Sequence, residues 1–177
     1  MKIHNLKEAA KTLNYLTEHG ITEYDVLASR VETAAADFET VSISIKQMEH
    51  RMEQIAALKT HIINYAKTRN TYLAYRKTKA ADKPAFRAAH ETDLLLHEAA
   101  KRAFDALGVK KLPTVKVLQA EYTDLLAKKK AAYEDFKRLR QENQELQAVK
   151  SNVDSLLQIK QEEKKEQKQE KKQEQDR

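Results

Sequence analysis

The sequence predicts an all-α protein: an elongated antiparallel helical hairpin, or coiled-coil stalk, with a short helix at each end region and a disordered charged tail. Two Gly and two Pro in 177 residues leave few places where the chain can turn. Ala, Glu, Lys, Leu and Gln are abundant, and these residues favour helix. Two apolar stripes with heptad spacing then determine how the helices pair.

The first apolar stripe follows a spacing that alternates four and three residues for four heptads. Such spacing leaves one narrow apolar seam along a long helix. A lone helix cannot bury a seam, so we expect a helical partner for it. The stripe consists of Leu27, Val31, Ala34, Phe38, Val41, Ile45, Met48, Met52 and Ile55.

A second stripe in the same chain is a candidate partner. Lys129, Asn143 and Lys150 interrupt it, and we expect these polar residues to fix register and partner choice at some cost in stability. A heptad pattern does not say whether its partner belongs to the same chain, so a hairpin and a homodimer both stay open. The stripe consists of Leu118, Tyr122, Leu125, Ala132, Phe136, Leu139, Leu146, Val153 and Leu157.

Residues 1–20 are expected to form the first short helix, over 6–19. Asn5 and Glu8 have the spacing of a capping box near its start. Gly20 is a suitable residue to end it.

Residues 21–78 are expected to form the long stalk helix. Thr22 and Asp25 have capping-box spacing at its start, and the apolar pattern continues to about Lys77. The distal part of this helix is rich in basic residues.

Residues 79–112 are expected to contain a turn, a tip helix and a connector. Pro84 disfavours helical geometry at Lys83, so the chain turns there. The tip helix then runs from about Pro84 to Leu107 and is ended by Gly108.

Residues 113–160 are expected to form the long return helix, which Thr114 opens. Residues 161–177 contain only Gln, Glu, Lys, Asp and Arg, so they have nothing to bury. Like charges recur there four residues apart, which weakens a helix. We therefore expect a disordered tail.

Basic residues are concentrated between Lys59 and Arg87, where eight Lys and Arg accompany one acidic residue, Asp82. Arg and Lys displace counterions from phosphates, and Tyr can stack on an unpaired base, so this segment is a candidate nucleic-acid surface. Alternatively, the Tyr rings and Arg stems pack on a neighbouring helix and the charges are merely solvated. The candidate nucleic-acid-binding residues are Lys67, Arg69, Tyr72, Arg76, Lys77, Lys79 and Lys83.

His90, Asp93 and His97 recur at three and four residues, which places zinc-type ligands on one helical face. Leucines separate them and no fourth ligand is evident nearby, so we expect no metal and no cofactor. The chain also lacks a phosphate-binding Gly-rich loop, a nucleophile elbow and a zinc-protease motif, so we expect no enzyme.

No apolar run approaches the roughly 20 residues of a membrane span, so we expect no membrane insertion. The absence of Cys fits a reducing compartment, and we expect the protein in the cytoplasm.

Four runs of sequence are distinctive: AKTLNYLTEHGI at 10–21, LKTHIINYAKTR at 58–69, KKLPTVK at 110–116 and VKSNVD at 149–154. These runs resemble the C-terminal helical region of large conjugative relaxases, the mobilisation nucleases of integrative and conjugative elements in Gram-positive gut bacteria. The resemblance extends over about 6–157.

Relaxases nick one DNA strand with a Tyr nucleophile and a histidine-bound metal in an N-terminal domain that these residues do not resemble. No Tyr of this chain lies in a matching motif, so none receives a catalytic role. The resemblance implies a non-catalytic module for mobilisation that assists DNA binding, single-stranded DNA included, or relaxosome assembly. Its partners would be DNA and relaxosome or transfer-channel proteins. A coiled-coil spacer or self-association scaffold without DNA contact is the alternative.

Overall fold

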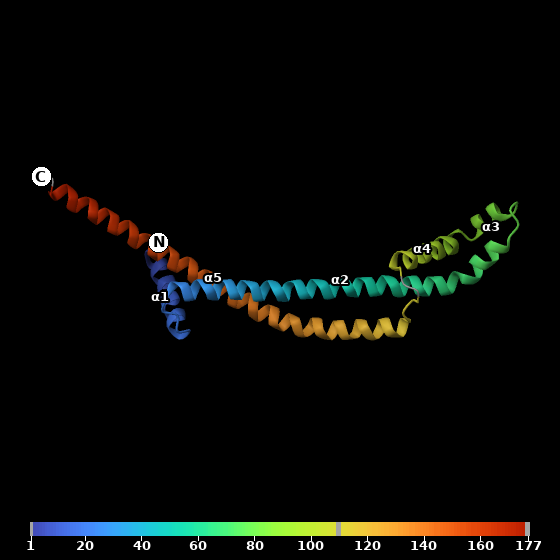
Figure 1. Cartoon of the computed structure of the whole chain (residues 1–177), viewed down its shortest axis with the longest axis horizontal. Helices are drawn as coiled ribbons and strands as arrows, with labels where there is room; N and C mark the ends of the chain where they lie inside the picture. Colours follow the sequence, from blue (N-terminus) through green and yellow to red (C-terminus); the bar gives the residue numbers. More distant parts are fainter. Residues whose placement is uncertain (1, 109–110, 176–177) are drawn as a thin grey trace. The chain divides into compact units, whose positions relative to one another are not determined.

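The structure, a computed structural model, is all-α over its described residues (Figure 1). It describes the backbone of residues 2–108 and 111–175 and the side chains of residues 6–108 and 111–158. The predicted all-α class is thereby confirmed. No helix in the described part carries an apolar stretch long enough to cross a membrane. The helices are α1 (Lys2–Glu18), α2 (Tyr24–Lys77), α3 (Lys83–Ala89), α4 (Glu91–Leu107) and α5 (Val115–Gln175).

The chain divides into two compact units, and α2 and α5 each contribute to both. Unit 1 comprises Met1–Ile43 and Tyr133–Arg177, and unit 2 comprises Ser44–Ala132. Unit 1 therefore contains α1, the first part of α2 and the last part of α5. Unit 2 contains the rest of α2, all of α3 and α4, and the start of α5.

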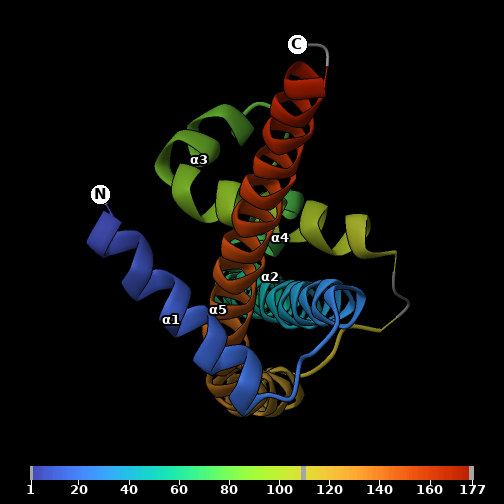
Figure 2. The same cartoon turned by 90° about the vertical axis from the view of Figure 1, so that its left-hand side faces the viewer.

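Unit 1 has a small apolar core in which three helices meet. Figures 1 and 2 show α1 at a steep angle to the start of α2. The hydroxyl of Thr12 on α1 accepts a 3.0 Å hydrogen bond from the Asn152 side chain of α5. Near the other end of this unit the rings of Phe38 and Phe136 lie 5.1 Å apart. The buried core residues are Ile21, Leu27, Ala34, Leu146 and Val149, with Tyr15, Leu16, Val31 and Val153 packed against them.

The predicted stop at Gly20 is confirmed, and its mechanism is visible. Gly20 has a φ of 62°, in the left-handed region that glycine adopts without strain. Its N–H binds the carbonyl of Thr17 at 3.2 Å, and the Ile21 N–H binds the carbonyl of Leu16 at 2.8 Å. These two bonds form a Schellman motif, and the buried Ile21 side chain completes it.

In unit 2, α2 packs on α5 first and on α4 further along. Lys129 of α5 binds Glu49 of α2 at 3.2 Å, and Arg51 binds Glu121 at 2.7 Å. Residue numbers rise along α2 as they fall along α5, so the two segments run in opposite directions within this unit. The buried apolar residues are Ile45, Met52 and Ile55 of α2, Leu94 and Ala100 of α4, and Leu118 of α5.

Both apolar stripes are largely removed from solvent. All nine residues of the first stripe are buried or half-buried. So are eight residues of the second, whereas Leu157 is 43% exposed. Two of its three polar interruptions bind charged partners, because Lys129 faces Glu49 and Lys150 binds Asp154 at 2.8 Å.

Three sequence predictions differ from the structure. α1 begins at Lys2, so Asn5 lies inside the helix rather than at its cap. The predicted tip helix is two helices, because His90, with φ −127° and ψ 29°, separates α3 from α4. The return helix does not end near 160, since α5 is helical to Gln175. The structure thus has helix over 161–175 where the sequence predicts disorder, and the high helix propensity of Glu, Lys and Gln favours that helix. Residues 176 and 177 of the predicted tail lie outside the described residues.

Candidate nucleic-acid interface

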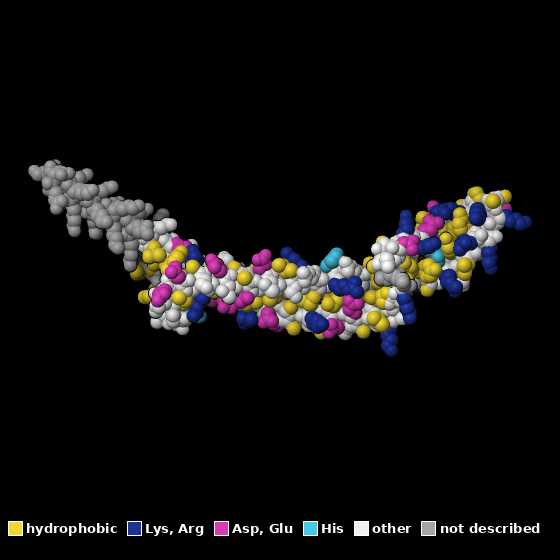
Figure 3. All heavy atoms as spheres, in the orientation of Figure 1, with side chains coloured by type: hydrophobic (Ala, Val, Ile, Leu, Met, Phe, Trp, Pro, Cys, Tyr) yellow, Lys and Arg dark blue, Asp and Glu magenta, His cyan; other side chains and the backbone are white. Residues whose placement is uncertain are grey.

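The basic character of the distal part of unit 2 survives folding. Residues 59–114 contain twelve Lys and Arg and five Asp and Glu, a net charge of +7, compared with +6 for the whole chain. α4 supplies most of these carboxylates but too few to cancel the excess. Figure 3 shows Lys and Arg side chains over α3 and the last turns of α2 on the face that it draws.

Five of the seven predicted residues are exposed cations. Four of them lie on α2 and the fifth lies in the turn that follows it. Within the described part of the chain, none of the five forms an ion pair with a carboxylate. These residues, called the distal cations below, are Lys67, Arg69, Arg76, Lys77 and Lys79.

The distal cations do not share one face of α2. Seven residues separate Arg69 from Arg76, so the two guanidinium groups are only about 20° apart around the helix axis. Lys77 is about 100° from Arg76, and Lys67 is about 160° from Arg69. The four cations on α2 therefore spread over about half of the helix circumference, centred away from the side that packs on α4, and do not form a narrow strip.

The other two predicted residues make contacts within the protein. The half-buried Tyr72 ring stacks on His97 with a centroid separation of 4.2 Å and an interplanar angle of 19°. The Lys83 ammonium lies 5.5 Å from the ring centre of Tyr75. One face of the Tyr72 ring is therefore covered by His97 of α4. This agrees with the alternative interpretation of the sequence, in which the Tyr rings pack on a neighbouring helix.

Arg87, the last basic residue of α3, forms an ion pair with Glu98 of α4. Its two terminal nitrogens donate to the two carboxylate oxygens of Glu98 at 3.2 and 3.3 Å. The hydrogen bonds to Glu98 raise the pKa of the Arg87 guanidinium, so it stays charged. Because the pair spans α3 and α4, this cation holds the two short helices together and is partly neutralised.

The three residues with zinc-type spacing have separate partners. His90 packs against Phe86 with the two rings tilted by 40° and 4.4 Å between their centres. Asp93 accepts a 2.9 Å hydrogen bond from the Thr71 hydroxyl, and His97 is buried among α2 side chains. Among the described residues, no three His, Cys, Asp or Glu side chains are arranged to hold a metal ion.

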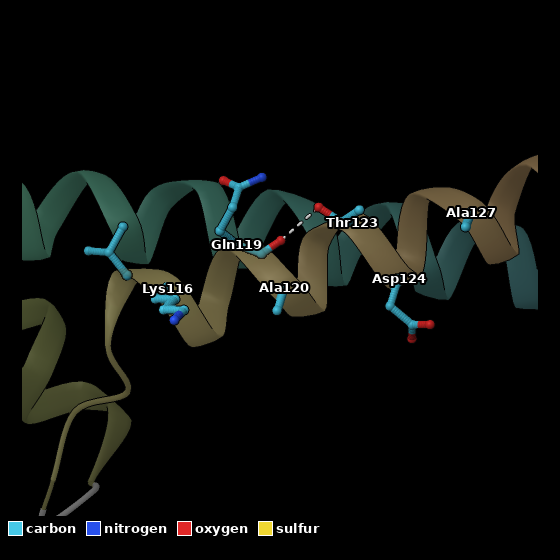
Figure 4. Close-up of a pocket in the computed structure, with 7 residues that line it drawn as sticks. Lys116, Gln119, Ala120, Thr123, Asp124 and Ala127 are labelled. Carbon is cyan, nitrogen blue, oxygen red and sulfur yellow. Dashed lines mark hydrogen bonds between the residues drawn. The ribbon is translucent and has the colours of Figure 1, made fainter.

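A shallow depression on α5 offers no catalytic group. Figure 4 shows Ala120 and Ala127 in it, with Lys116 and Asp124 as its charged residues. The hydroxyl of Thr123 donates to the Gln119 carbonyl at 2.9 Å, one turn earlier in the same helix. With no base beside that hydroxyl, nothing here resembles an activated nucleophile.

No family model, curated protein or solved structure matches this chain.

The sequence interpretation missed the most organised cluster of unit 2. Tyr65 and Tyr72 of α2 stack on opposite sides of His97, and Thr68 lies between them along the helix. The spacing of Tyr65, Thr68 and Tyr72 is three and four, which is the heptad signal. This spacing can be read from the sequence and places the three side chains on one face of α2. It does not indicate that the residue packed against that face is the imidazole of His97.

Proposed function

We propose that this chain is a non-catalytic helical module of a conjugative relaxase that binds single-stranded DNA through the distal cations. The observation that carries the proposal is five exposed Lys and Arg that form no ion pair with any described carboxylate, in a segment with a net charge of +7. Cations of this kind bind phosphates by releasing condensed counterions. The resemblance to relaxase C-terminal regions supports DNA as the polyanion.

The proposed contact is to the phosphate backbone rather than to bases. The distal cations on α2 cover about half of its circumference, a curved surface that a flexible single strand can follow more easily than a rigid duplex can. Tyr72 is left out of the proposed contact surface because His97 already covers one face of its ring. Binding should therefore depend on salt and show little sequence preference.

In the proposed arrangement, α2 and α5 form one antiparallel coiled-coil stalk within a chain. The contacts inside each unit support it, since Phe38 meets Phe136 and Glu49 meets Lys129 in the same antiparallel order. The stalk would carry the distal cations to the DNA in the cytoplasm and leave its sides for relaxosome or transfer-channel proteins.

The DNA proposal is tested by fluorescence anisotropy with a labelled single-stranded oligonucleotide at several salt concentrations. The variant Arg69→Gln, Arg76→Gln, Lys77→Gln, Lys79→Gln should bind more weakly. The slope of log affinity against log salt should become smaller by up to about 3, at roughly 0.7 per lost phosphate contact.

A matched control removes four exposed cations elsewhere. The variant Lys46→Gln, Lys116→Gln, Lys130→Gln, Arg140→Gln has the same net charge as the test variant, and all four residues are exposed. It should keep most of the wild-type affinity. Equal losses in the two variants, or no loss in the first, would contradict the proposed surface.

A scaffold without DNA contact is the second candidate, and one observation favours it. Leu95, Leu96 and Leu107 of α4 are 47%, 38% and 47% exposed. These side chains could receive another helix. Analytical ultracentrifugation tests the scaffold: a chain that stays monomeric at high concentration would count against self-association.

A further inference from the structure

His97 is the most enclosed titratable side chain of the described residues on α4. It is only 2% exposed. Tyr65 lies on one side of its imidazole and Tyr72 on the other, with ring centroids 4.4 and 4.2 Å away. Phe104 then meets Tyr65 edge-on at 5.5 Å. This stack, together with the buried Leu94 and Ala100, holds α4 against α2.

The hydrogen bonds around His97 fix its neutral tautomer. The Thr68 hydroxyl has one proton, which it donates to the Asn64 carbonyl at 2.7 Å. Its oxygen can therefore only accept from Nδ1 of His97, which lies 3.1 Å away. Nδ1 carries the proton of the neutral ring, and a second proton would have to enter at Nε2.

The charged groups near His97 do not favour a second proton. The ring faces of Tyr65 and Tyr72 attract a cation only weakly in comparison with the hydration lost on burial. Lys101, one turn along α4, repels an imidazolium, and this effect outweighs the attraction of Glu98, whose carboxylate is already bound by an arginine of α3. Burial, followed by Lys101, lowers the pKa of His97.

We propose that His97 is an acid-sensitive latch, whose protonation releases α4 from the distal part of α2. In the docked state the neutral ring fills the space between the two tyrosines. An imidazolium there keeps little hydration, and the nearby carboxylate of Glu98 is shared with Arg87, so the undocked state, in which water reaches the whole ring, binds the proton more tightly. The inference does not depend on DNA binding.

The sign of the effect follows from the two protonation states. The undocked histidine titrates near 6.5, and the docked histidine titrates lower. The contribution of the neutral ring to docking is therefore complete above pH 6.5 and is lost as the pH falls below it. Between pH 7.5 and pH 5.5 the equilibrium constant for undocking should rise by up to about 10-fold, while Asp and Glu remain largely ionised.

Hydrogen exchange on the intact chain tests the latch. The protection of amides 91–107, corrected for the intrinsic exchange rate, should fall by up to about 10-fold between pH 7.5 and pH 5.5. In His97→Asn, which keeps a side-chain N–H donor but does not titrate, the same protection should change little. His90→Asn removes an exposed neighbouring histidine and should show the wild-type fall. An equal fall in wild type and His97→Asn would overturn the latch.

A second measurement covers the case in which His97→Asn does not dock α4 at any pH. NMR titration of the imidazole resonances in the wild-type chain measures the pKa of His97 directly. A midpoint below 6.5 with loss of α4 protection in the same pH range supports the latch. A midpoint at or above 6.5 overturns it, because the docked state would then bind the proton at least as well as the undocked state.

Discussion

The phenol of Tyr24 on α2 donates a 2.6 Å hydrogen bond to the carboxylate of Asp154 on α5. Lys150 donates to the other oxygen of the same carboxylate at 2.8 Å, and its ammonium lies 5.4 Å from the centre of the Tyr24 ring. The hydrogen bonds from Lys150 and then Tyr24 lower the pKa of Asp154. These three side chains connect the two long helices at one end of unit 1.

Replacing Tyr24 with Phe should lower the urea midpoint of unit 1, because Asp154 then loses its contact with the opposite helix while Lys150 remains. Tyr24 is exposed and Asp154 is only half-buried, so the effect should be modest. A double-mutant cycle with Asp154→Ala, which removes the acceptor, followed by circular dichroism, measures the coupling. If the losses of unfolding free energy in the two single variants simply add in the double variant, the hydrogen bond contributes nothing to stability.

The first apolar stripe predicts which side chains stabilise unit 2. Ile55 is fully buried, whereas Ile63, eight residues later on α2, is 42% exposed. Ile55→Ala should cost about 2–5 kcal/mol of unfolding free energy, and Ile63→Ala should cost less than about 1 kcal/mol. Urea unfolding monitored by circular dichroism measures both. Similar costs at the two positions would mean that the stripe does not face a partner.

The Schellman motif at the end of α1 depends on a left-handed residue. A Cβ at Gly20 would meet no atom within 4 Å, so only the backbone conformation opposes a side chain there. Gly20→Ala should therefore destabilise unit 1 by about 1 kcal/mol in thermal unfolding. Gly20→Asn should cost less, since Asn tolerates this conformation better. Equal costs for Ala and Asn would indicate a steric cause instead.

The period of the stripes allowed the buried residues of α2 and α5 to be predicted. Heptad spacing determines which side chains share a face, so burial of Leu27, Ile45 and Ile55 followed from the sequence alone. The end of α1 was equally predictable, because few residues other than Gly20 suit a left-handed position.

The remaining features depend on which helices meet, and the sequence pattern does not contain this information. The break at His90 has no Gly or Pro to mark it. Tyr72 was predicted as a base-stacking residue because its spacing matches that of the arginines. Its ring faces His97 because α3 and the turn before it return α4 along α2. That contact depends on the length of the turn.

The account depends most on the two stripes being partners within a single chain. Cross-linking tests this directly, since the wild-type chain has no Cys. A Glu49→Cys, Lys129→Cys variant treated with a short bismaleimide should give an internally linked monomer, because these side chains meet across α2 and α5. Glu49→Cys, Lys130→Cys, with the second thiol on the exposed side of α5, is the matched control and should react poorly. Linked dimers in place of the linked monomer, or equal yields from the two variants, would contradict the account.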